Sequence, residues 1–186
     1  QRLQAYAPGK RVLDVFSYVG GWGIQAACAG ATQVTCVDSS SGAIDSVHHN
    51  AKINGLDNIE TIEGDAFDAL KALCDEKEKF DIVVLDPPAL IPRRRDQKAG
   101  EEAYARLNQL GLRLLDRDGL LVSASCSMHL SQEKLTDIIR SSGRKIDRFV
   151  QLLEQGHQAP DHPVVPGIPE TDYIKSCFVR SLTGFL

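Results

Sequence analysis

The segment FDIVVLDPP, residues 80–88, restricts the fold more than any other part of this chain. Its apolar residues follow one another almost without a break, which is typical of a parallel strand covered by helices on both faces. Two prolines then end the strand, because proline has no N–H to donate to a neighbouring strand. The segment therefore predicts the centre of a parallel α/β sheet.

Strand-like and helix-like segments alternate through the rest of the chain. Further strands are expected at residues 11–19, 33–38, 59–65, 119–127, 145–153 and 173–182. Helices are expected at the very start and over residues 24–31, 39–56, 66–79, 101–116 and 132–141. The pattern predicts one doubly wound α/β domain over residues 1–186, with a mainly parallel, seven-stranded, Rossmann-like sheet and an antiparallel last strand.

Composition excludes several classes of protein. The 186 residues are 42% hydrophobic and 25% charged, as in an ordinary globular domain. No apolar run approaches the roughly 18 residues of a membrane span, and the start lacks a signal peptide, so we expect a cytoplasmic protein without membrane contact. The five cysteines are scattered, without metal-ligand spacing, which predicts reduced thiols and no metal. The net charge of −4 restricts any basic surface to a local patch.

The residues with the most chemistry follow the predicted strands. In an open α/β sheet, ligands bind beyond the carboxyl ends of the parallel strands. Five strand ends carry such residues, namely Gly20 with Gly21, then Asp38, Asp65, Asp86 and Cys126. A single glycine or aspartate there is more often a turn former, but five converging ends favour a ligand site.

Two cofactors fit the first of these ends. The segment GWGIQA, residues 21–26, matches a dinucleotide-binding pattern, and Asp38 follows at about the distance expected for a ribose contact. Asp14, however, lies within the first strand, where a buried carboxylate needs a partner. S-adenosylmethionine offers an ammonium and a sulfonium, so Asp14 favours this methyl donor over a nicotinamide dinucleotide. Phe16 and Trp22 could contact it or form a core aromatic cluster.

Six motifs carry a more specific resemblance: VLDVFSYVGGW, VTCVDSS, FDIVVLDPP, SASCS, QAPDHPV and PETDYIK. In this order they resemble the RlmI-like family of bacterial 23S ribosomal RNA cytosine-5 methyltransferases, over about residues 11–179. The resemblance implies a class I methyltransferase fold, S-adenosylmethionine as cofactor and RNA, ribosomal RNA in this family, as substrate. It also implies an upstream RNA-binding module of the PUA type, so we expect the chain to be the catalytic domain only, the C-terminal fragment of a longer protein.

The resemblance assigns roles to particular residues. Cys126 is expected to add to carbon 6 of the cytosine, and Asp86 to bind the cytosine edge. The expected cofactor-binding residues are Asp14, Phe16, Ser17, Tyr18, Gly20, Gly21, Asp38, Ser39, Asp65, Asp86 and Pro87. The expected substrate-binding residues are Pro88, Arg93, Arg94, Arg95, Tyr104, Asn108, Asp161 and His162. Asp38 would accept from the ribose hydroxyls and Asp65 from the adenine amino group.

Some observations leave alternatives open. Ala89 departs from the lysine that the family often has after D-P-P, and Pro88 stands where many RNA cytosine-5 methyltransferases carry a second cysteine. The basic run 93–95 could be a solvated loop, and D-H-P at residues 161–163 could be a structural turn. Two other functions remain possible on the sequence, an exocyclic-amine methyltransferase without a covalent step and a noncatalytic nucleotide- or RNA-binding domain.

Overall fold

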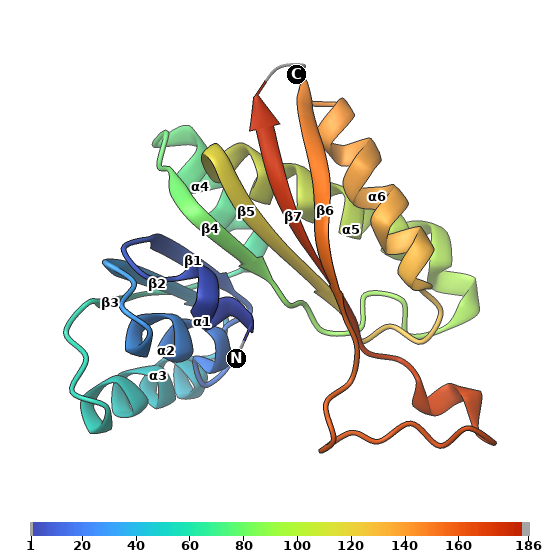
Figure 1. Ribbon diagram of the computed structural model, residues 1–186, viewed down its shortest axis with the longest axis horizontal. Helices are drawn as coiled ribbons and strands as arrows, with labels where there is room; N and C mark the ends of the chain where they lie inside the picture. Colours follow the sequence, from blue (N-terminus) through green and yellow to red (C-terminus); the bar gives the residue numbers. More distant parts are fainter. Residues whose placement is uncertain (1, 184–186) are drawn as a thin grey trace.

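The sheet is the centre of the computed structural model, which describes residues 2–183 (Figure 1). Its seven strands lie in the order β3-β2-β1-β4-β5-β7-β6. The strands are β1 (Arg11–Val15), β2 (Gln33–Asp38), β3 (Ile59–Glu63), β4 (Phe80–Leu85), β5 (Leu115–Ser125), β6 (Arg148–Gly156) and β7 (Lys175–Thr183). Neighbours from β3 to β5 are parallel, while β7 is antiparallel to both β5 and β6. The predicted fold class is confirmed; residue 1 and residues 184–186 of the predicted domain lie outside the described residues.

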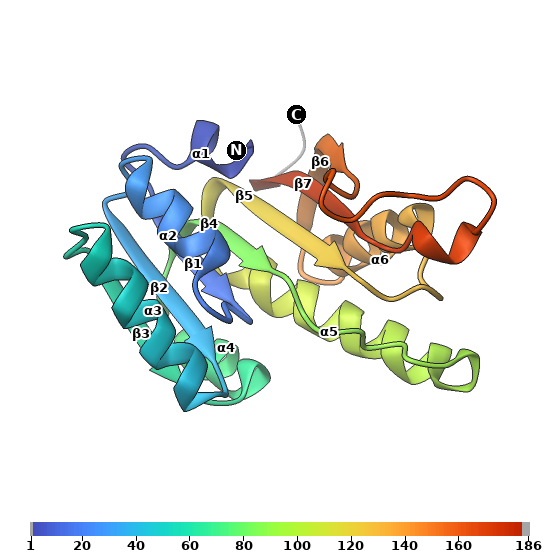
Figure 2. The same ribbon diagram turned by 90° about the horizontal axis from the view of Figure 1, so that it is seen from below.

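Helices cover both faces of this sheet (Figure 2). They are α1 (Arg2–Tyr6), α2 (Gly21–Cys28), α3 (Ser41–Ile53), α4 (Ala66–Asp75), α5 (Gln97–Leu114) and α6 (Gln132–Arg144), with short 3-10 turns η1 (Arg94–Asp96) and η2 (Pro169–Thr171). Residues of α1, α2 and α3 share one apolar cluster with the strands, and residues of α4, α5 and α6 share the other. Among the described residues, no helix combines the length and apolar character needed to cross a membrane.

Element boundaries differ from the predicted ones where the backbone changes conformation. The first strand was expected to reach residue 19 but ends at Val15, because Phe16 and Tyr18 have φ angles of 63° and 49°, outside the extended region. Helix α5 begins at Gln97 instead of residue 101 and so takes up the end of the predicted basic loop. The chain therefore changes direction immediately after β1, ahead of Gly20 and Gly21.

Close contact between α2 and the sheet explains the third glycine of the segment GGWG. A Cβ added at Gly23 would lie 2.6 Å from the Sγ of Cys36 on β2 and 3.1 Å from the Oδ2 of Asp14 on β1. No larger side chain fits there without moving the helix. Gly20 serves the turn itself, since it is the N-cap of α2 and has the left-handed φ of 84° that glycine tolerates.

Candidate active site

A cavity of about 370 Å³ opens where the chain order of the sheet reverses. Strands β1 and β4 are neighbours, but the chain continues from β1 toward β2 and from β4 toward β5. Such a switch point at the carboxyl ends of parallel strands is the usual place for a ligand in this class of fold. The cavity is lined by Leu3, Phe16, Ser17, Tyr18, Val19, Gly21, Trp22, Gln25 and Asp86.

Five of the predicted cofactor-binding residues line this cavity, and they are Phe16, Ser17, Tyr18, Gly21 and Asp86. The Ser17 hydroxyl is buried and, among the described residues, has no hydrogen-bond partner. A buried hydroxyl without a partner is costly, so a polar ligand in the cavity would relieve this cost. Gln25, one turn into α2, also lines the cavity and was not predicted from the sequence.

The carboxylate of Asp38 holds the loop that shapes the cavity. Its Oδ2 accepts a hydrogen bond from the backbone N–H of Tyr18 at 2.8 Å, and its Oδ1 accepts one from the N–H of Ser40 at 3.0 Å. A carboxylate has about four acceptor positions, so both oxygens can still accept from a ligand hydroxyl. The neighbouring Ser39 is exposed.

Asp65 is exposed and serves as the N-cap of α4. Its Oδ1 accepts hydrogen bonds from the backbone N–H groups of Phe67 at 2.9 Å and Asp68 at 3.2 Å. Both capping bonds go to one oxygen, which leaves Oδ2 outside the cap. The adenine contact expected for Asp65 stays a prediction, because Asp65 does not line the described cavity.

The expected contact between Asp14 and the cofactor stays a prediction. Asp14 is fully buried, and its Oδ1 has no hydrogen-bond partner among the described residues. The partner that a buried carboxylate needs comes from the chain itself, since the N–H of Gly23 donates to Oδ2 at 2.8 Å. Burial, opposed by this hydrogen bond, raises the pKa of Asp14 to about 7. Asp14 therefore positions the first turn of α2 through its hydrogen bond with Gly23.

The thiol of Cys126 lies at the same edge of the sheet, beside the D-P-P turn. Its Sγ lies 3.9 Å from the backbone oxygen of Pro87, which it can reach as a weak donor. The indole N–H of Trp22 donates to Oδ2 of Asp86 at 2.8 Å and fixes that carboxylate between the cavity and the thiol. Burial raises the pKa of the Cys126 thiol, the Asp86 carboxylate raises it further, and Lys175 lowers it.

Tyr104 and Asn108 were expected to contact RNA, and this expectation is wrong. Both are fully buried on α5. The Tyr104 hydroxyl is hydrogen-bonded to the hydroxyls of Ser125 at 2.8 Å and Ser127 at 3.0 Å, the two serines that flank Cys126. Asn108 donates to the backbone oxygen of Tyr104 at 2.8 Å. Tyr104 therefore supports the segment that carries the thiol from inside the protein.

The expected RNA-binding residues at the surface are only partly brought together. Pro88 and the arginines 93–95 are exposed next to the D-P-P turn. Arg93 and Arg95 both face Asp96, with N···O distances of 3.0 and 3.9 Å, so part of the local positive charge is neutralised. This arrangement is compatible with phosphate contacts from the exposed loop, which remain a prediction.

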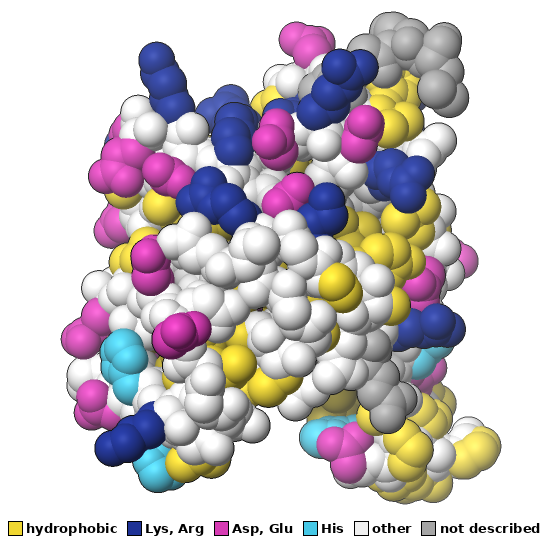
Figure 3. Space-filling model, turned by 60° about the vertical axis from the view of Figure 1, so that its left-hand side comes forward, with side chains coloured by type: hydrophobic (Ala, Val, Ile, Leu, Met, Phe, Trp, Pro, Cys, Tyr) yellow, Lys and Arg dark blue, Asp and Glu magenta, His cyan; other side chains and the backbone are white. Residues whose placement is uncertain are grey.

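Residues 157–172 form an exposed loop beyond β6, with hydrophobic side chains on its outside (Figure 3). Its D-H-P segment is a turn, because the N–H of His162 donates to the backbone oxygen of Ala159 at 2.9 Å. His162 and Asp161 face each other at 3.3 Å. Among the interactions that the structure describes, none joins these two residues to Cys126 or Asp86, so the geometry agrees with the structural alternative.

A larger cavity, of about 690 Å³, lies at the opposite edge of the sheet. The residues that line it precede β4, β5 and β6 or begin β6, namely Cys74, Asp75, Lys77, Glu78, Lys79, Arg113, Lys145, Ile146, Asp147 and Arg148. None of the predicted site residues is among them. The smaller cavity at the switch point is therefore the better candidate for the cofactor site.

The amino-acid sequence is similar to one family model and to several ribosomal RNA methyltransferases. The family model described as conserved hypothetical protein 95 matches residues 1–138. Ribosomal RNA large subunit methyltransferase I of Klebsiella pneumoniae subsp. pneumoniae is 38% identical over 177 residues, which are 94% of this chain and 44% of the relative. The protein of the same name from Aeromonas salmonicida is 38% identical over 183 residues, 97% of this chain and 46% of the relative. The chain thus spans less than half the length of these relatives.

Solved structures share the fold. SMU.776 complexed with SAH has a TM-score of 0.83 at 24% identity, over 96% of this chain and 47% of that chain. TrmN from Thermus thermophilus has a TM-score of 0.66 at 19% identity, over 98% of this chain and 48% of that chain. Because the family model covers most of the residues, the chain belongs to the family described as conserved hypothetical protein 95, and its resemblance to the RlmI-like methyltransferases is confirmed.

Proposed function

We propose that this chain transfers a methyl group to carbon 5 of a cytosine in RNA, and that the RNA is large-subunit ribosomal RNA. One observation carries the proposal: the Cys126 thiol lies against the D-P-P turn, with Sγ 3.9 Å from the Pro87 oxygen and Asp86 beside it. A cytosine-5 methyltransferase needs a nucleophile and a group that binds the base edge at one place. The names of the relatives, ribosomal RNA large subunit methyltransferases, support the choice of RNA.

S-adenosylmethionine, when bound, would supply the methyl group as an electrophilic sulfonium carbon. The cavity at the switch point suits a small polar ligand, since it combines the unpartnered Ser17 hydroxyl with the aromatic side chains of Phe16 and Trp22. Asp38 has acceptor capacity left for hydroxyl groups next to the same loop. The SAH bound in SMU.776, which shares this fold, supports the choice of cofactor.

The role of Cys126 follows from the chemistry of cytosine. Carbon 5 is a poor nucleophile, so the ring must be activated before it can accept a methyl group. The thiolate adds to carbon 6, forming an S–C bond, and the electron pair of the carbon 5–carbon 6 double bond becomes available at carbon 5. After methylation a base removes the carbon 5 proton, the double bond forms again, and the sulfur leaves with its electron pair.

In this proposal, Asp86 holds the base during the addition. The indole N–H of Trp22 holds one carboxylate oxygen, Oδ2, so the Asp86 side chain is oriented before the base binds. The other oxygen can accept a hydrogen bond from the cytosine amino group and stabilise a protonated ring nitrogen. Electron density that moves into the ring when the thiolate adds is thereby stabilised.

Trapping with 5-fluorocytidine tests the covalent step. Fluorine cannot leave carbon 5 as a proton does, so RNA transcribed with 5-fluorocytidine should remain covalently bound to the protein in the presence of S-adenosylmethionine. The complex should be visible by denaturing electrophoresis. Cys126→Ala should abolish it, whereas Cys28→Ala, which changes an exposed cysteine on α2, should not.

Other outcomes separate the alternatives. A complex that survives Cys126→Ala would remove Cys126 from the role of nucleophile. Methylation of a cytosine or adenine amino group without trapping would favour the exocyclic-amine reaction. RNA binding without any methyl transfer by the full-length protein would favour a noncatalytic domain.

A further inference from the structure

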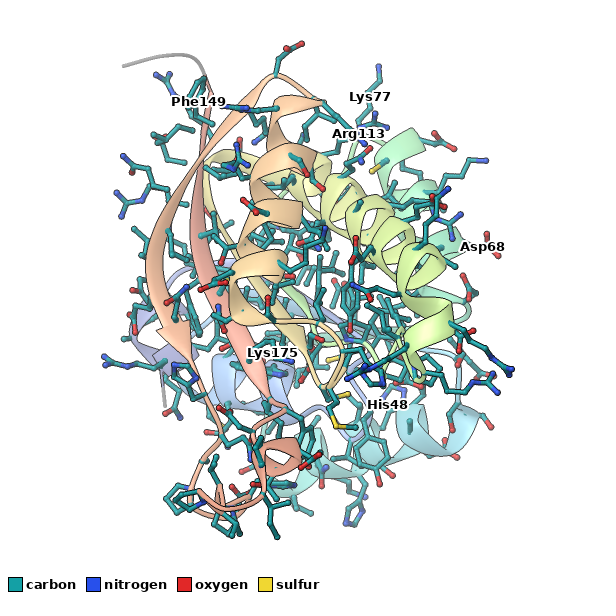
Figure 4. All side chains as sticks on the ribbon, turned by 90° about the vertical axis from the view of Figure 1, so that its right-hand side faces the viewer. His48, Asp68, Lys77, Arg113, Phe149 and Lys175 are labelled. Carbon is teal, nitrogen blue, oxygen red and sulfur yellow. The ribbon has the colours of Figure 1, made fainter. Side chains whose placement is uncertain are left out.

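A buried lysine from a distant part of the chain lies next to the proposed nucleophile. Strand β7 runs antiparallel to β5, so its first residue, Lys175, pairs in register with Ser125, the last residue of β5. The Lys175 side chain is only 6% exposed, and its Nζ donates to the backbone oxygen of Ser127 at 2.8 Å. Figure 4 shows Lys175 at the start of β7, beside the segment that joins β5 to α6.

The burial of this ammonium group calls for an explanation. Lysine is rarely buried without a charged partner, because the transfer of an ammonium from water costs several kcal/mol. A single hydrogen bond to a backbone oxygen uses only one of its three N–H donors. Within residues 2–183, burial lowers the pKa of Lys175, and two ionisable groups, the Cys126 thiol and the Asp172 carboxylate, raise it.

In the described part of the chain, three ionisable groups act on Cys126 from three different elements. Asp86 follows β4, Tyr104 lies on α5 and Lys175 begins β7. The carboxylate and the phenol offer no positive charge, so Lys175 is the cation of this group. Arginines 93–95 follow the same turn but are exposed, and two of them face Asp96.

We propose that Lys175 is the positioning residue that stabilises the thiolate of Cys126 for its attack on the base. This inference rests on the proposed function of Cys126 as nucleophile. The thiol releases its proton to solvent, the sulfur keeps the electron pair, and the lysine remains an ammonium throughout. Because both groups are partly or fully shielded from water, their attraction is screened less than that of a surface pair. When the sulfur leaves carbon 6, the same ammonium stabilises it again.

A purely structural role would have a different consequence. Lys175 could serve only to hold the Ser127 segment through its backbone hydrogen bond, and its charge would then be irrelevant. The pH dependence of thiol reactivity distinguishes the two roles, because only the charge changes the thiolate fraction. Lys175→Arg keeps the charge, and Lys175→Met removes it at similar side-chain length.

The experiment measures alkylation of Cys126 by iodoacetamide from pH 7 to pH 11 in the full chain, because burial raises the pKa of this thiol. The thiolate displaces iodide, so the rate follows the thiolate fraction, and mass spectrometry of the peptides resolves each cysteine. Lys175→Met should raise the midpoint pH by about one unit, which lowers the rate at pH 7 about tenfold. Lys175→Arg should stay near the wild-type midpoint. Lys134→Met, at an exposed lysine on α6, is the matched control and should change nothing.

Each outcome decides the matter. An unchanged midpoint in Lys175→Met would overturn the proposal, and so would an equal rise in Lys175→Arg. If Lys175→Met does not fold, Lys175→Gln replaces it with the same expected rise, because it keeps an N–H donor without the charge. Exposed Cys28 in each sample reports general effects on reactivity. Alkylation needs neither RNA nor methyl donor, so trapping with 5-fluorocytidine RNA, compared between wild type and Cys126→Ala, tests the proposed function separately.

Discussion

At the scale of single residues, Asp14 shows what the burial of a carboxyl group beside the site does to its pKa. Its carboxyl group is fully buried, with one oxygen bonded to the Gly23 N–H and the other, Oδ1, without a partner among the described residues. Burial makes the charged form unfavourable, which is why the pKa of Asp14 rises to about 7. The turn that begins α2 is therefore tied to a group that titrates near neutral pH.

Replacement of Asp14 by asparagine should remove a pH dependence of stability. Between pH 3.8 and about 7, the folded protein keeps a proton on Asp14 that the unfolded chain has released. The wild-type free energy of unfolding therefore falls as the pH rises through this window, by about 2 to 4 kcal/mol from this group. Asp14→Asn keeps an oxygen for Gly23 and should lack this fall, as urea denaturation of ligand-free protein at several pH values would show.

The control for Asp14→Asn is Asp137→Asn, at an exposed carboxylate on α6. It should follow the wild-type dependence on pH. Parallel curves for wild type and Asp14→Asn would contradict the raised pKa of Asp14.

At the scale of elements, the distance between α2 and the sheet depends on a single glycine. The helix begins at the cavity, so any movement of α2 also moves Gly21 and Trp22, which line it. Gly23 allows the contact because a side chain there would overlap Cys36 on β2. Helix packing and ligand geometry are thus coupled at this position.

Alanine substitutions at two glycines of α2 should differ in their effect on stability. Gly23→Ala should lower the free energy of unfolding by about 1 to 3 kcal/mol, because the added methyl group lies 2.6 Å from the Cys36 sulfur. Gly21→Ala places its methyl group where nothing lies within 4 Å, and should change stability by less than about 0.5 kcal/mol. Thermal and urea unfolding without ligand would compare them, and equal losses would show that α2 does not approach the sheet so closely.

For the whole molecule, charge must be local if RNA is to bind, since the chain carries a net charge of −4. Two groups of basic residues lie at opposite edges of the sheet. One is the exposed loop 93–95 beside the D-P-P turn, and the other lines the cavity of about 690 Å³. The proposed chemistry places RNA at the first edge, where Cys126 and Asp86 lie.

Removal of the three arginines 93–95 should weaken RNA binding with little dependence on RNA sequence. Each lost phosphate contact flattens the dependence of affinity on salt, so the triple alanine variant should reduce the slope of log affinity against log salt by about two. Lys77→Ala combined with Arg113→Ala, at the opposite edge, is the matched control. A larger effect of this control variant would indicate that RNA binds at the other edge of the sheet. RNA titrations at four salt concentrations measure the affinity and the salt slope of both variants.

The order of elements and the edge of the sheet at which the switch-point cavity opens could be predicted from the sequence, because both depend on local signals. The apolar run of β4, the glycine turn after β1 and the acidic strand ends are all read within a few residues. Tyr104 and Asn108 could also have been placed inside, since they share the buried face of α5 with Leu107 and Gly111 at helical spacing. Their polar character suggested a surface role instead.

Other features were decided by tertiary structure. Asp14 finds its partner in Gly23 only because α2 packs back on β1, and Lys175 meets Cys126 only because β7 pairs antiparallel with β5 in one particular register. Contacts of this kind depend on the alignment of segments far apart in the chain, which hydrophobic periodicity does not contain. The sequence by itself determined which strands end in reactive groups, while the packing of helices and the strand register decided which of those groups face the cavity, the core or one another.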